Sequence, residues 1–314
     1  MNDIRIVFMG TPDFACNILQ TLINNKYNIV CVITQPDKPV GRKKILEPTP
    51  VKVIAQTNNI DVLQPINIKE DYKDILEYKP DIIITCAYGQ IIPKDILEYP
   101  KYKCINIHAS LLPKYRGGAP IHYAIINGDT KTGITIMNMV EKMDAGDILV
   151  QEEINIDIKD TTEILFNKLS ILGSNMIIKY LDDYINNKLV PIKQDESKVS
   201  YAYNITRDKE FINFNREVLE VYNHIRGLIS WPIGYSIIND IKIKFYDIEY
   251  ISDNNSIPLK VYGLKDNKLQ IGCINGYILV NKLQVAGKTI MDAKIFYNGY
   301  KNRIEDKYFE EYIN

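Results

Sequence analysis

The stretch IRIVFMGTPDFACNILQTL, residues 4–22, decides the fold. Its first part, Ile4–Met9, is an apolar run that ends at Gly10. Apolar residues at helical spacing then follow Thr11 and Pro12. A strand, a glycine turn and a helix with proline near its first turn are the opening of a βα unit.

The same alternation of strands and helices continues through residue 189. Asp81–Ala87 is a continuous apolar run, which is typical of a strand buried on both faces of a parallel sheet. Thr49 and Pro50 are expected to be the N-cap and the first residue of a helix. Further strands are expected at Asn28–Thr34, Cys104–His108 and Thr132–Val140, and further helices at Ile121–Asn127 and Thr162–Asn187. This order predicts an α/β, Rossmann-like parallel sheet over residues 1–189.

The pattern changes after residue 189. Residues 190–206 are polar and irregular and are expected to form a linker. In residues 207–314 a helix is predicted at Arg216–Ile229, and Phe214 and Trp231 are expected to pack in the core. Five short β-like runs follow: Gly234–Ile238, Ile241–Ile251, Leu259–Tyr262, Lys268–Ile274 and Tyr277–Gln284. Short strands separated by Gly and Asn turns predict a small antiparallel OB-like β-barrel domain.

The bulk composition limits the class of protein. With 46% hydrophobic and 25% charged residues among 314, the chain is expected to be globular, and its net charge of -1 offers no overall attraction to RNA or DNA. The five cysteines form no CxxC pair and the three histidines have no ligand spacing, so no metal is expected. The N-terminus is too polar for a signal peptide, and no apolar run reaches the roughly 18 residues of a membrane span. These features predict a cytoplasmic protein that is not bound to a membrane.

Two polar residues at the end of a predicted strand are the first candidates for a site. Asn106 and His108 are two residues apart, so both point to one face of the strand. In open α/β sheets, ligands bind outside the carboxyl ends of the strands. The alternative is that the pair only caps the strand end. Asp144, in EKMDAGDIL at residues 141–149, is a third candidate whose alternative role is to close a turn.

Motifs spread along most of the chain resemble those of the methionyl-tRNA formyltransferases, a folate-dependent formyltransferase family. They are FMGTPDFA at residues 8–15, QPDKPVGR at 35–42, PTPVK at 48–52, AYGQIIP at 87–93, INIHASLLPKYRGGAPI at 105–121, TGITIM at 132–137 and MDAGDIL at 143–149. The resemblance implies transfer of the formyl group of 10-formyltetrahydrofolate to the amino group of methionine on initiator methionyl-tRNA.

The resemblance also implies roles for residues. Asn106, His108 and Asp144 are the implied catalytic residues, and Ser110, Leu111, Leu112 and Pro113 the implied folate contacts. An amide and an imidazole N–H suit binding of the oxyanion that develops during formyl transfer. Further residues at predicted strand ends are expected to line the folate site: Phe8, Met9, Gly10, Ala87, Tyr88 and Gly89. A dinucleotide loop at Gly10 is the rival interpretation, but the G-x-G-x-x-G spacing is missing.

The basic loop at residues 36–47 resembles the part of the family that enters the acceptor stem of the tRNA. Lys38, Arg42, Lys43 and Lys44 are the implied tRNA contacts, and Lys52 is a further basic candidate. The alternative is a solvated basic loop without a partner. Lys43 stands where the family usually has glycine. No DNA partner is expected, and the chain is expected to be a monomer.

Three other functions stay open at this point. The acceptor can be another amine, on a nucleotide sugar or a purine precursor. Water can replace the amine, which would make the protein a formyltetrahydrofolate hydrolase. The chain can also be a folate-binding or RNA-binding module without activity.

Overall fold

The computed structural model describes residues 3–41 and 44–311. Its internal contacts divide the chain into two compact units. The first unit runs to Pro120 and also includes Lys131–Asn155 and Phe166–Tyr203, and the second holds Ile121–Thr130, Ile156–Leu165 and the chain from Asn204 onward. The predicted domain limits of 1–189, 190–206 and 207–314 stay a prediction.

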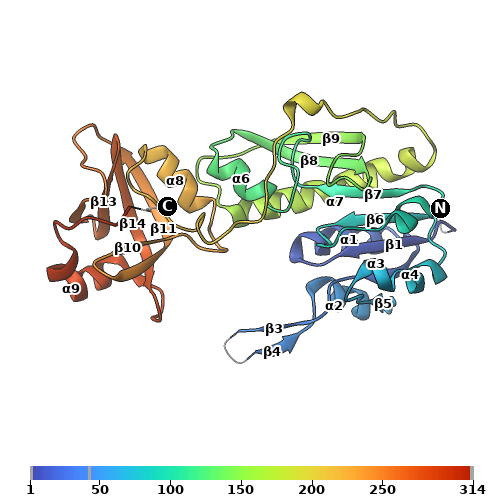
Figure 1. The fold of residues 1–314 in the computed structure, drawn as a ribbon, viewed down its shortest axis with the longest axis horizontal. Coiled ribbons are helices and arrows are strands. Elements are labelled where there is room, and N and C mark those ends of the chain that lie inside the picture. The colour runs from blue at the N-terminus through green and yellow to red at the C-terminus, as the bar shows by residue number, and fades with distance from the viewer. Residues whose placement is uncertain (1–2, 42–43, 312–314) are drawn as a thin grey trace. The chain divides into compact units, whose positions relative to one another are not determined.

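A seven-stranded sheet of order β5-β2-β1-β6-β7-β8-β9 forms the centre of the described part of the first unit (Figure 1). The strands are β1 (Ile6–Gly10), β2 (Ile29–Ile33), β5 (Val62–Leu63), β6 (Ile82–Cys86), β7 (Cys104–His108), β8 (Lys131–Asn138) and β9 (Ile148–Asn155). Strands β5, β2, β1, β6 and β7 are parallel to their neighbours, as predicted, whereas β8 runs antiparallel to both β7 and β9. The sheet is therefore mixed, and the sequence pattern did not indicate the direction of β8.

Helices cover both faces of this sheet. They are α1 (Asp13–Asn24), α2 (Pro50–Thr57), α3 (Ile68–Asp71), α4 (Lys73–Glu77), α5 (Lys94–Glu98) and α7 (Thr162–Ile185). Thr49 caps α2 as predicted, because its side chain accepts a hydrogen bond from Lys52 N. A short antiparallel hairpin, β3 (Lys38–Val40) and β4 (Ile45–Glu47), projects from the unit beside α2 (Figure 1).

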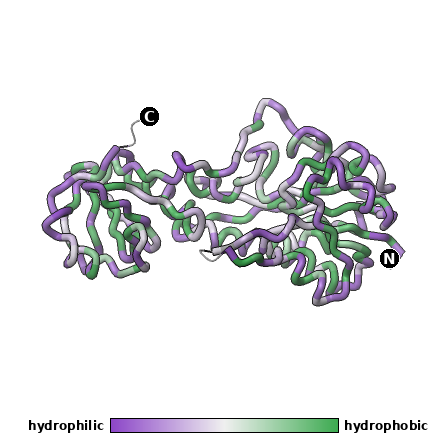
Figure 2. Tube along the Cα trace, turned by 60° about the horizontal axis from the view of Figure 1, so that its bottom comes forward, coloured by the Kyte–Doolittle hydropathy of each residue, from purple (hydrophilic) through white to green (hydrophobic). Residues whose placement is uncertain are grey.

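The two faces of the sheet have separate cores. On one face, Gly173 of α7 faces β7 and β8 so closely that a Cβ there would lie 3.2 Å from Ile107 Cγ2. On the other face, Val7, Met9 and Ile83 pack with side chains from the α3–α5 region. Figure 2 shows the chain coloured by hydropathy, with hydrophobic and hydrophilic stretches alternating along it. Alternation along β7 therefore directs Asn106 and His108 to the face opposite Ile107 and α7.

The second unit contains an antiparallel sheet of order β10-β11-β14-β13-β12, with β15 paired to β14. Its elements are α6 (Pro120–Ile126), α8 (Val218–Arg226), β10 (Tyr235–Ile238), β11 (Ile241–Ser252), β12 (Val261–Lys265), β13 (Lys268–Cys273), β14 (Gly276–Val285), β15 (Met291–Asp292) and α9 (Ala293–Ile304). The five predicted β runs correspond to β10–β14. Helix α9 was not predicted, because polar residues and Gly299 interrupt its apolar face.

The two aromatic residues expected in this core behave differently. Phe214 is fully buried between Phe245 and Phe309, as predicted. The prediction for Trp231 was wrong, because its side chain is 69% exposed. Trp231 lies in the turn after α8, where its ring meets the edge of His122, while Ile233 enters the core instead.

All five cysteines are free thiols, and four of them are buried. Burial raises the pKa of Cys16 to about 11 and the pKa of Cys31, Cys104 and Cys273 to about 12, and it also raises that of Cys86. At neutral pH these sulfurs are therefore protonated.

Candidate active site

Asn106 presents an amide donor on the face of β7 opposite α7. Its Oδ1 accepts a hydrogen bond from Thr85 Oγ1 of the neighbouring strand β6 at 2.8 Å. This bond fixes which end of the amide faces the sheet. Among the described residues none accepts a hydrogen bond from the Asn106 NH2 group, so both of its N–H donors are available to a ligand.

His108 is held by groups at both ring nitrogens and is 6% exposed. Its Nε2 lies 2.9 Å from the carbonyl oxygen of Tyr115, which can only accept, so Nε2 carries a hydrogen. Nδ1 is therefore the nitrogen that can gain or lose a proton, and it lies 3.8 Å from Asp144 Oδ2. That separation is too long for a hydrogen bond, and it leaves the carboxylate facing Nδ1.

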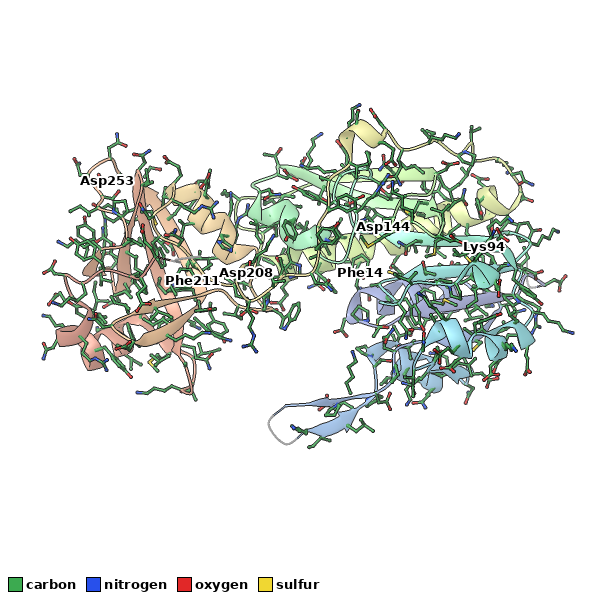
Figure 3. The ribbon with its side chains drawn as sticks, in the orientation of Figure 1. Phe14, Lys94, Asp144, Asp208, Phe211 and Asp253 are labelled. Carbon is green, nitrogen blue, oxygen red and sulfur yellow. The ribbon has the colours of Figure 1, made fainter. Side chains whose placement is uncertain are left out.

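Asp144 lies in the loop between β8 and β9, where Figure 3 labels it. Its backbone is left-handed, with φ of 50°, a conformation that aspartate tolerates better than most residues. Its Oδ2 accepts a hydrogen bond from the backbone N–H of Gly117 at 2.8 Å. The structure thus brings the three predicted catalytic residues to one region, with Asn106 and His108 on one face of β7 and Asp144 against His108.

The loop after β7 supplies the groups that orient both His108 and Asp144. Tyr115 gives its carbonyl to His108, and Gly117 gives its N–H to Asp144. Gly117 has φ of 120°, and a Cβ there would lie 2.7 Å from the carbonyl oxygen of Ala202. Only glycine fits this position.

The predicted folate loop, Ser110–Pro113, is pinned to β8 and β9. Thr135 Oγ1 donates to Ser110 O at 2.6 Å and accepts from Leu112 N at 3.1 Å, and Gln151 donates to Leu112 O at 2.8 Å. Ser110 and Leu112 are buried, and the Ser110 hydroxyl donates to Lys114 O. Leu111 and Pro113 keep exposed surface, so they are the two side chains of this loop that can contact a ligand.

The other predicted folate residues fall into two groups. Phe8 and Met9 have no exposed surface, and a Cβ on Gly10 would lie 2.7 Å from Ala15 Cβ, so these three serve the packing of β1. Ala87 and Gly89, after β6, are exposed and have positive φ.

Tyr88 lies between these two residues and is almost fully buried. Its backbone carbonyl accepts hydrogen bonds from Thr11 Oγ1 at 3.0 Å and Gln35 Nε2 at 3.2 Å. The turn after β6 is therefore fixed, and its exposed backbone is available to a ligand.

The predicted tRNA contacts lie on the hairpin or outside the described residues. Lys38 and Lys44 are exposed on the hairpin, whereas Arg42 and Lys43 lie outside the described residues. Lys52 is bound to Asp37 Oδ2 at 2.6 Å and to Gln64 Oε1 at 2.7 Å. The ammonium group of Lys52 thus fixes the base of the hairpin, and its contact with RNA stays a prediction.

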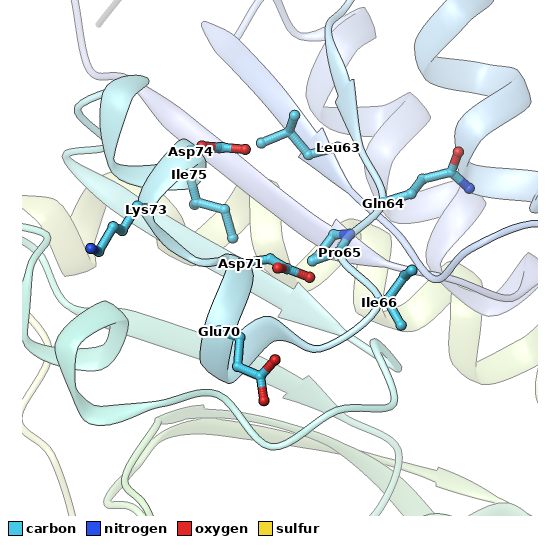
Figure 4. A pocket seen from close by; sticks show the side chains of 9 residues that line it. All are labelled: Leu63, Gln64, Pro65, Ile66, Glu70, Asp71, Lys73, Asp74 and Ile75. Atoms are coloured by element: carbon cyan, nitrogen blue, oxygen red, sulfur yellow. The ribbon is translucent and has the colours of Figure 1, made fainter.

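The first unit has a hollow that is lined by other residues than the predicted ones. It is lined by Leu63–Ile66, Glu70, Asp71 and Lys73–Ile75, around β5, α3 and α4 (Figure 4). None of the predicted site residues lines it. Over residues 3–41 and 44–311, no group of three or more His, Cys, Asp and Glu side chains is placed to hold a metal ion. None of the helices described there has the length and hydropathy needed to cross a membrane.

Sequence reasoning missed the residues that orient the site. Thr85 is the one hydroxyl within an apolar strand, which was the indication available. Tyr115 and Gly117 act through backbone atoms, which a side-chain pattern cannot reveal.

The family is shown by two sequence models. The model described as formyl transferase matches residues 4–181, and the model described as formyl transferase, C-terminal domain, matches residues 204–301. The chain belongs to the formyltransferase family. Among its relatives, the methionyl-tRNA formyltransferase of Bacillus cytotoxicus is 50% identical over 312 residues, covering 98% of this chain and 99% of that protein. That of Bacillus mycoides is 48% identical over 307 residues, covering 96% and 98%.

Two solved structures share the fold. WlaRD, a sugar 3N-formyl transferase solved in the presence of dTDP and 5-N-formyl-THF, is 26% identical with a TM-score of 0.65, covering 91% of this chain and 99% of that one. HypX from Aquifex aeolicus aligns with a TM-score of 0.69 at 15% identity, over 99% of this chain and 52% of that one, which shows the fold alone.

Proposed function

We propose that this family member transfers the formyl group of 10-formyltetrahydrofolate to the amino group of methionine on initiator methionyl-tRNA, in the cytoplasm. The observation that carries the proposal is the arrangement around His108. Its Nε2 is tied to Tyr115, its Nδ1 faces Asp144, and Asn106 presents its NH2 group on the same face of β7. The relatives that are 48–50% identical and carry the same name support the acceptor.

The proposed reaction forms one bond and breaks one. The neutral amino nitrogen of methionine attacks the formyl carbon, the bond from that carbon to N10 breaks, one proton leaves the amine, and one proton arrives at N10. Negative charge builds on the formyl oxygen during the attack. The NH2 of Asn106 and a protonated Nδ1 of His108 are the groups placed to bind that charge, and one such donor contributes about 3 kcal/mol in comparable sites.

The residues of this chain divide the work of the proton transfer. Nε2 of His108 is committed to Tyr115, so the proton on Nδ1 is the one that the ring delivers to N10, and the proton lost by the amine then restores Nδ1. Asp144 lies beside that atom and stabilises the imidazolium when it forms. Gly117 holds the carboxylate in place without changing its charge.

The residues present fit a folate donor. Leu111 and Pro113 offer apolar surface next to the catalytic face, and Ala87 and Gly89 offer exposed backbone at the next strand end. A pterin requires apolar surface together with a few polar groups that fix its orientation. In the proposal these four residues contact the folate, while Phe8, Met9, Gly10, Tyr88, Ser110 and Leu112 support the walls from behind.

Three alanine variants test the catalytic assignment. Asn106→Ala, His108→Ala and Asp144→Ala are each expected to lower the single-turnover rate of formylation by on the order of 100-fold or more. The assay uses 10-formyltetrahydrofolate and charged initiator tRNA. Rates within tenfold of the wild-type rate for all three variants would rule out these roles.

The same assay separates the proposed acceptor from its rivals. Formate release without formyl-methionine would make the protein a hydrolase. Formylation of a dTDP-linked amino sugar but not of methionyl-tRNA would favour the activity named for WlaRD. Binding of folate or RNA with no turnover would leave a binding module.

Lys38 and Lys44 carry the proposed RNA contact, together with Arg42 and Lys43. If these residues contact phosphates, the affinity for tRNA falls as salt rises, and replacing Lys38 and Lys44 by alanine reduces the slope by about 2. A flat response in the wild-type protein would contradict the phosphate contacts. The monomeric state stays a prediction.

A further inference from the structure

The polar segment at residues 190–203 packs onto the first unit instead of forming a free linker. Ile192 exchanges two backbone hydrogen bonds of 2.8 Å with Ile148 at the start of β9. Ser200 O accepts from Arg116 N at 2.9 Å, and Ala202 N donates to Arg116 O at 2.8 Å. The segment thus lies beside both loops of the catalytic region, although neither family model covers it, since they match residues 4–181 and 204–301.

Gln194 of this segment uses its whole side-chain amide to join the two loops. Its Nε2 donates to the carbonyl oxygens of Asp144 and Gly146, each at 2.8 Å. Its Oε1 accepts from Arg116 Nε at 3.0 Å and from Arg116 Nη2 at 2.7 Å. One side of the amide therefore holds the loop of Asp144, and the other side holds the loop after β7.

Arg116 makes this connection rigid. Its side chain is fully buried, and a buried guanidinium is costly unless its N–H groups are paired. Gln194 pairs Nε and Nη2, and the exposed carboxylate of Glu196, 2.7 Å from Nη2, adds a second partner there, whereas the buried Nη1 has no hydrogen-bond partner among the described residues. In sequence Arg116 stands between Tyr115, which orients His108, and Gly117, which binds Asp144.

The contacts of Gln194 act directly on the Asp144 backbone. A left-handed conformation at a residue other than glycine costs free energy, which contacts with the surroundings can offset. Gln194 bonds to the carbonyl of that same residue and to the carbonyl two residues later. Without these bonds, the hydrogen bond from Gly117 N would be the one contact among the described residues that holds the Asp144 side chain.

We propose that Gln194 is a positioning residue that holds Asp144 against Nδ1 of His108, so that the supposed linker completes the active site. The inference rests on the proposed function only through the chemistry of His108 and Asp144, not through the identity of the acceptor. Gln194 acts through Asp144 and touches no substrate.

Two substitutions separate the halves of the contact in the full-length protein. Gln194→Leu removes all four hydrogen bonds. Gln194→Glu keeps an acceptor for Arg116 but turns a carboxylate oxygen toward the carbonyls of Asp144 and Gly146. Both variants are expected to lower kcat by about 10- to 100-fold and to change KM for folate and tRNA by less than about threefold. Lys193→Ala, on the exposed neighbour, is the matched control and is expected to keep the wild-type kcat.

A double-mutant cycle decides whether Gln194 works through Asp144. In an Asp144→Ala background, Gln194→Leu is expected to change kcat by less than about twofold, because the group that it positions is already gone. A full 10- to 100-fold further loss would overturn the proposal and leave a general structural role. Wild-type kcat in Gln194→Glu would also overturn it, since pairing of Arg116 would then be the only need.

Thermal unfolding of each variant identifies global instability, and the cycle is measured below the lowest melting temperature. If the wild-type protein formylates a different amine, the proposal of methionyl-tRNA as acceptor is refuted. The double-mutant cycle is then run with that amine and still tests the role of Gln194. If methionyl-tRNA is formylated but Gln194→Leu keeps its kcat, this inference alone fails. A chain without formyl transfer or formyl-folate hydrolysis would overturn both.

Discussion

Replacing Asp144 with asparagine removes one charge from the site and leaves its backbone contacts in place. The substituted side chain can still accept the hydrogen bond from Gly117 N through its amide oxygen, and asparagine tolerates the left-handed backbone at φ of 50°. When His108 is protonated, its Nδ1 and the Asp144 carboxylate are opposite charges 3.8 Å apart, which attract each other by about 4 kcal/mol at an effective dielectric constant of about 20. Because the side chain of Asp144 is 15% exposed, solvent reduces this energy.

We therefore expect Asp144→Asn to lower the single-turnover formylation rate by roughly 100- to 1000-fold, at about 1.4 kcal/mol for each factor of ten. The melting temperature is expected to stay within about 2 °C of the wild-type value. Asp266→Asn is the matched control, since Asp266 has φ of 51° in an exposed turn between β12 and β13. A rate within tenfold of wild type for Asp144→Asn, with the fold intact, would show that the charge of Asp144 does not assist His108.

Three further perturbations have outcomes that follow from the structure. Burial lowers the pKa of His224 to about 4 from its usual 6.5, so as the pH falls the unfolded chain binds a proton before the folded protein does. Urea titrations of the wild-type protein should therefore show the free energy of unfolding falling by up to about 3 kcal/mol between pH 6.5 and 4. His224→Asn should lack this fall. Hydrogen bonding to Arg116 and Lys142 lowers the pKa of Glu196 to about 2 from 4.5. The stabilisation that the Glu196 carboxylate provides is therefore complete above pH 4.5 and is lost as the pH falls toward 2. The melting temperatures of the wild-type protein and Glu196→Gln should converge over that range. Gly117→Ala should destabilise the protein by about 1–3 kcal/mol and reduce kcat. Gly287 also has a positive φ, of 81°, but has open space around it, so Gly287→Ala should leave kcat unchanged. Equal losses of kcat in the two variants would refute the reasoning.

The parallel strands were the most predictable part of the fold. Strands β1, β6 and β7 are buried on both faces, so they appear in the sequence as continuous apolar runs. Thr49 and Pro50 marked the start of α2 because capping is a local interaction. The direction of β8 was not predictable in this way, since alternation of side chains is the same for parallel and antiparallel neighbours. Strand β9 has polar residues at alternate positions on one face and was not recognised.

In the candidate site, too, contacts between residues close in sequence were predictable and contacts between residues far apart in sequence were not. Asn106 and His108 could be paired because a strand fixes the relation of residues two apart. Their contacts with Thr85 and Asp144 join positions 21 and more residues away, which spacing alone does not encode. Gln194 is the extreme case, since its partner Asp144 lies 50 residues earlier and both stand among other polar residues.

The shielded thiols described above make the chain well suited to site-specific labelling. A maleimide reacts with thiolate, and burial keeps each of the five native sulfurs protonated at neutral pH. A single cysteine introduced in place of exposed Lys38 would react far faster than any of them. A fluorophore there would report contact between the hairpin and RNA without any prior removal of native cysteines.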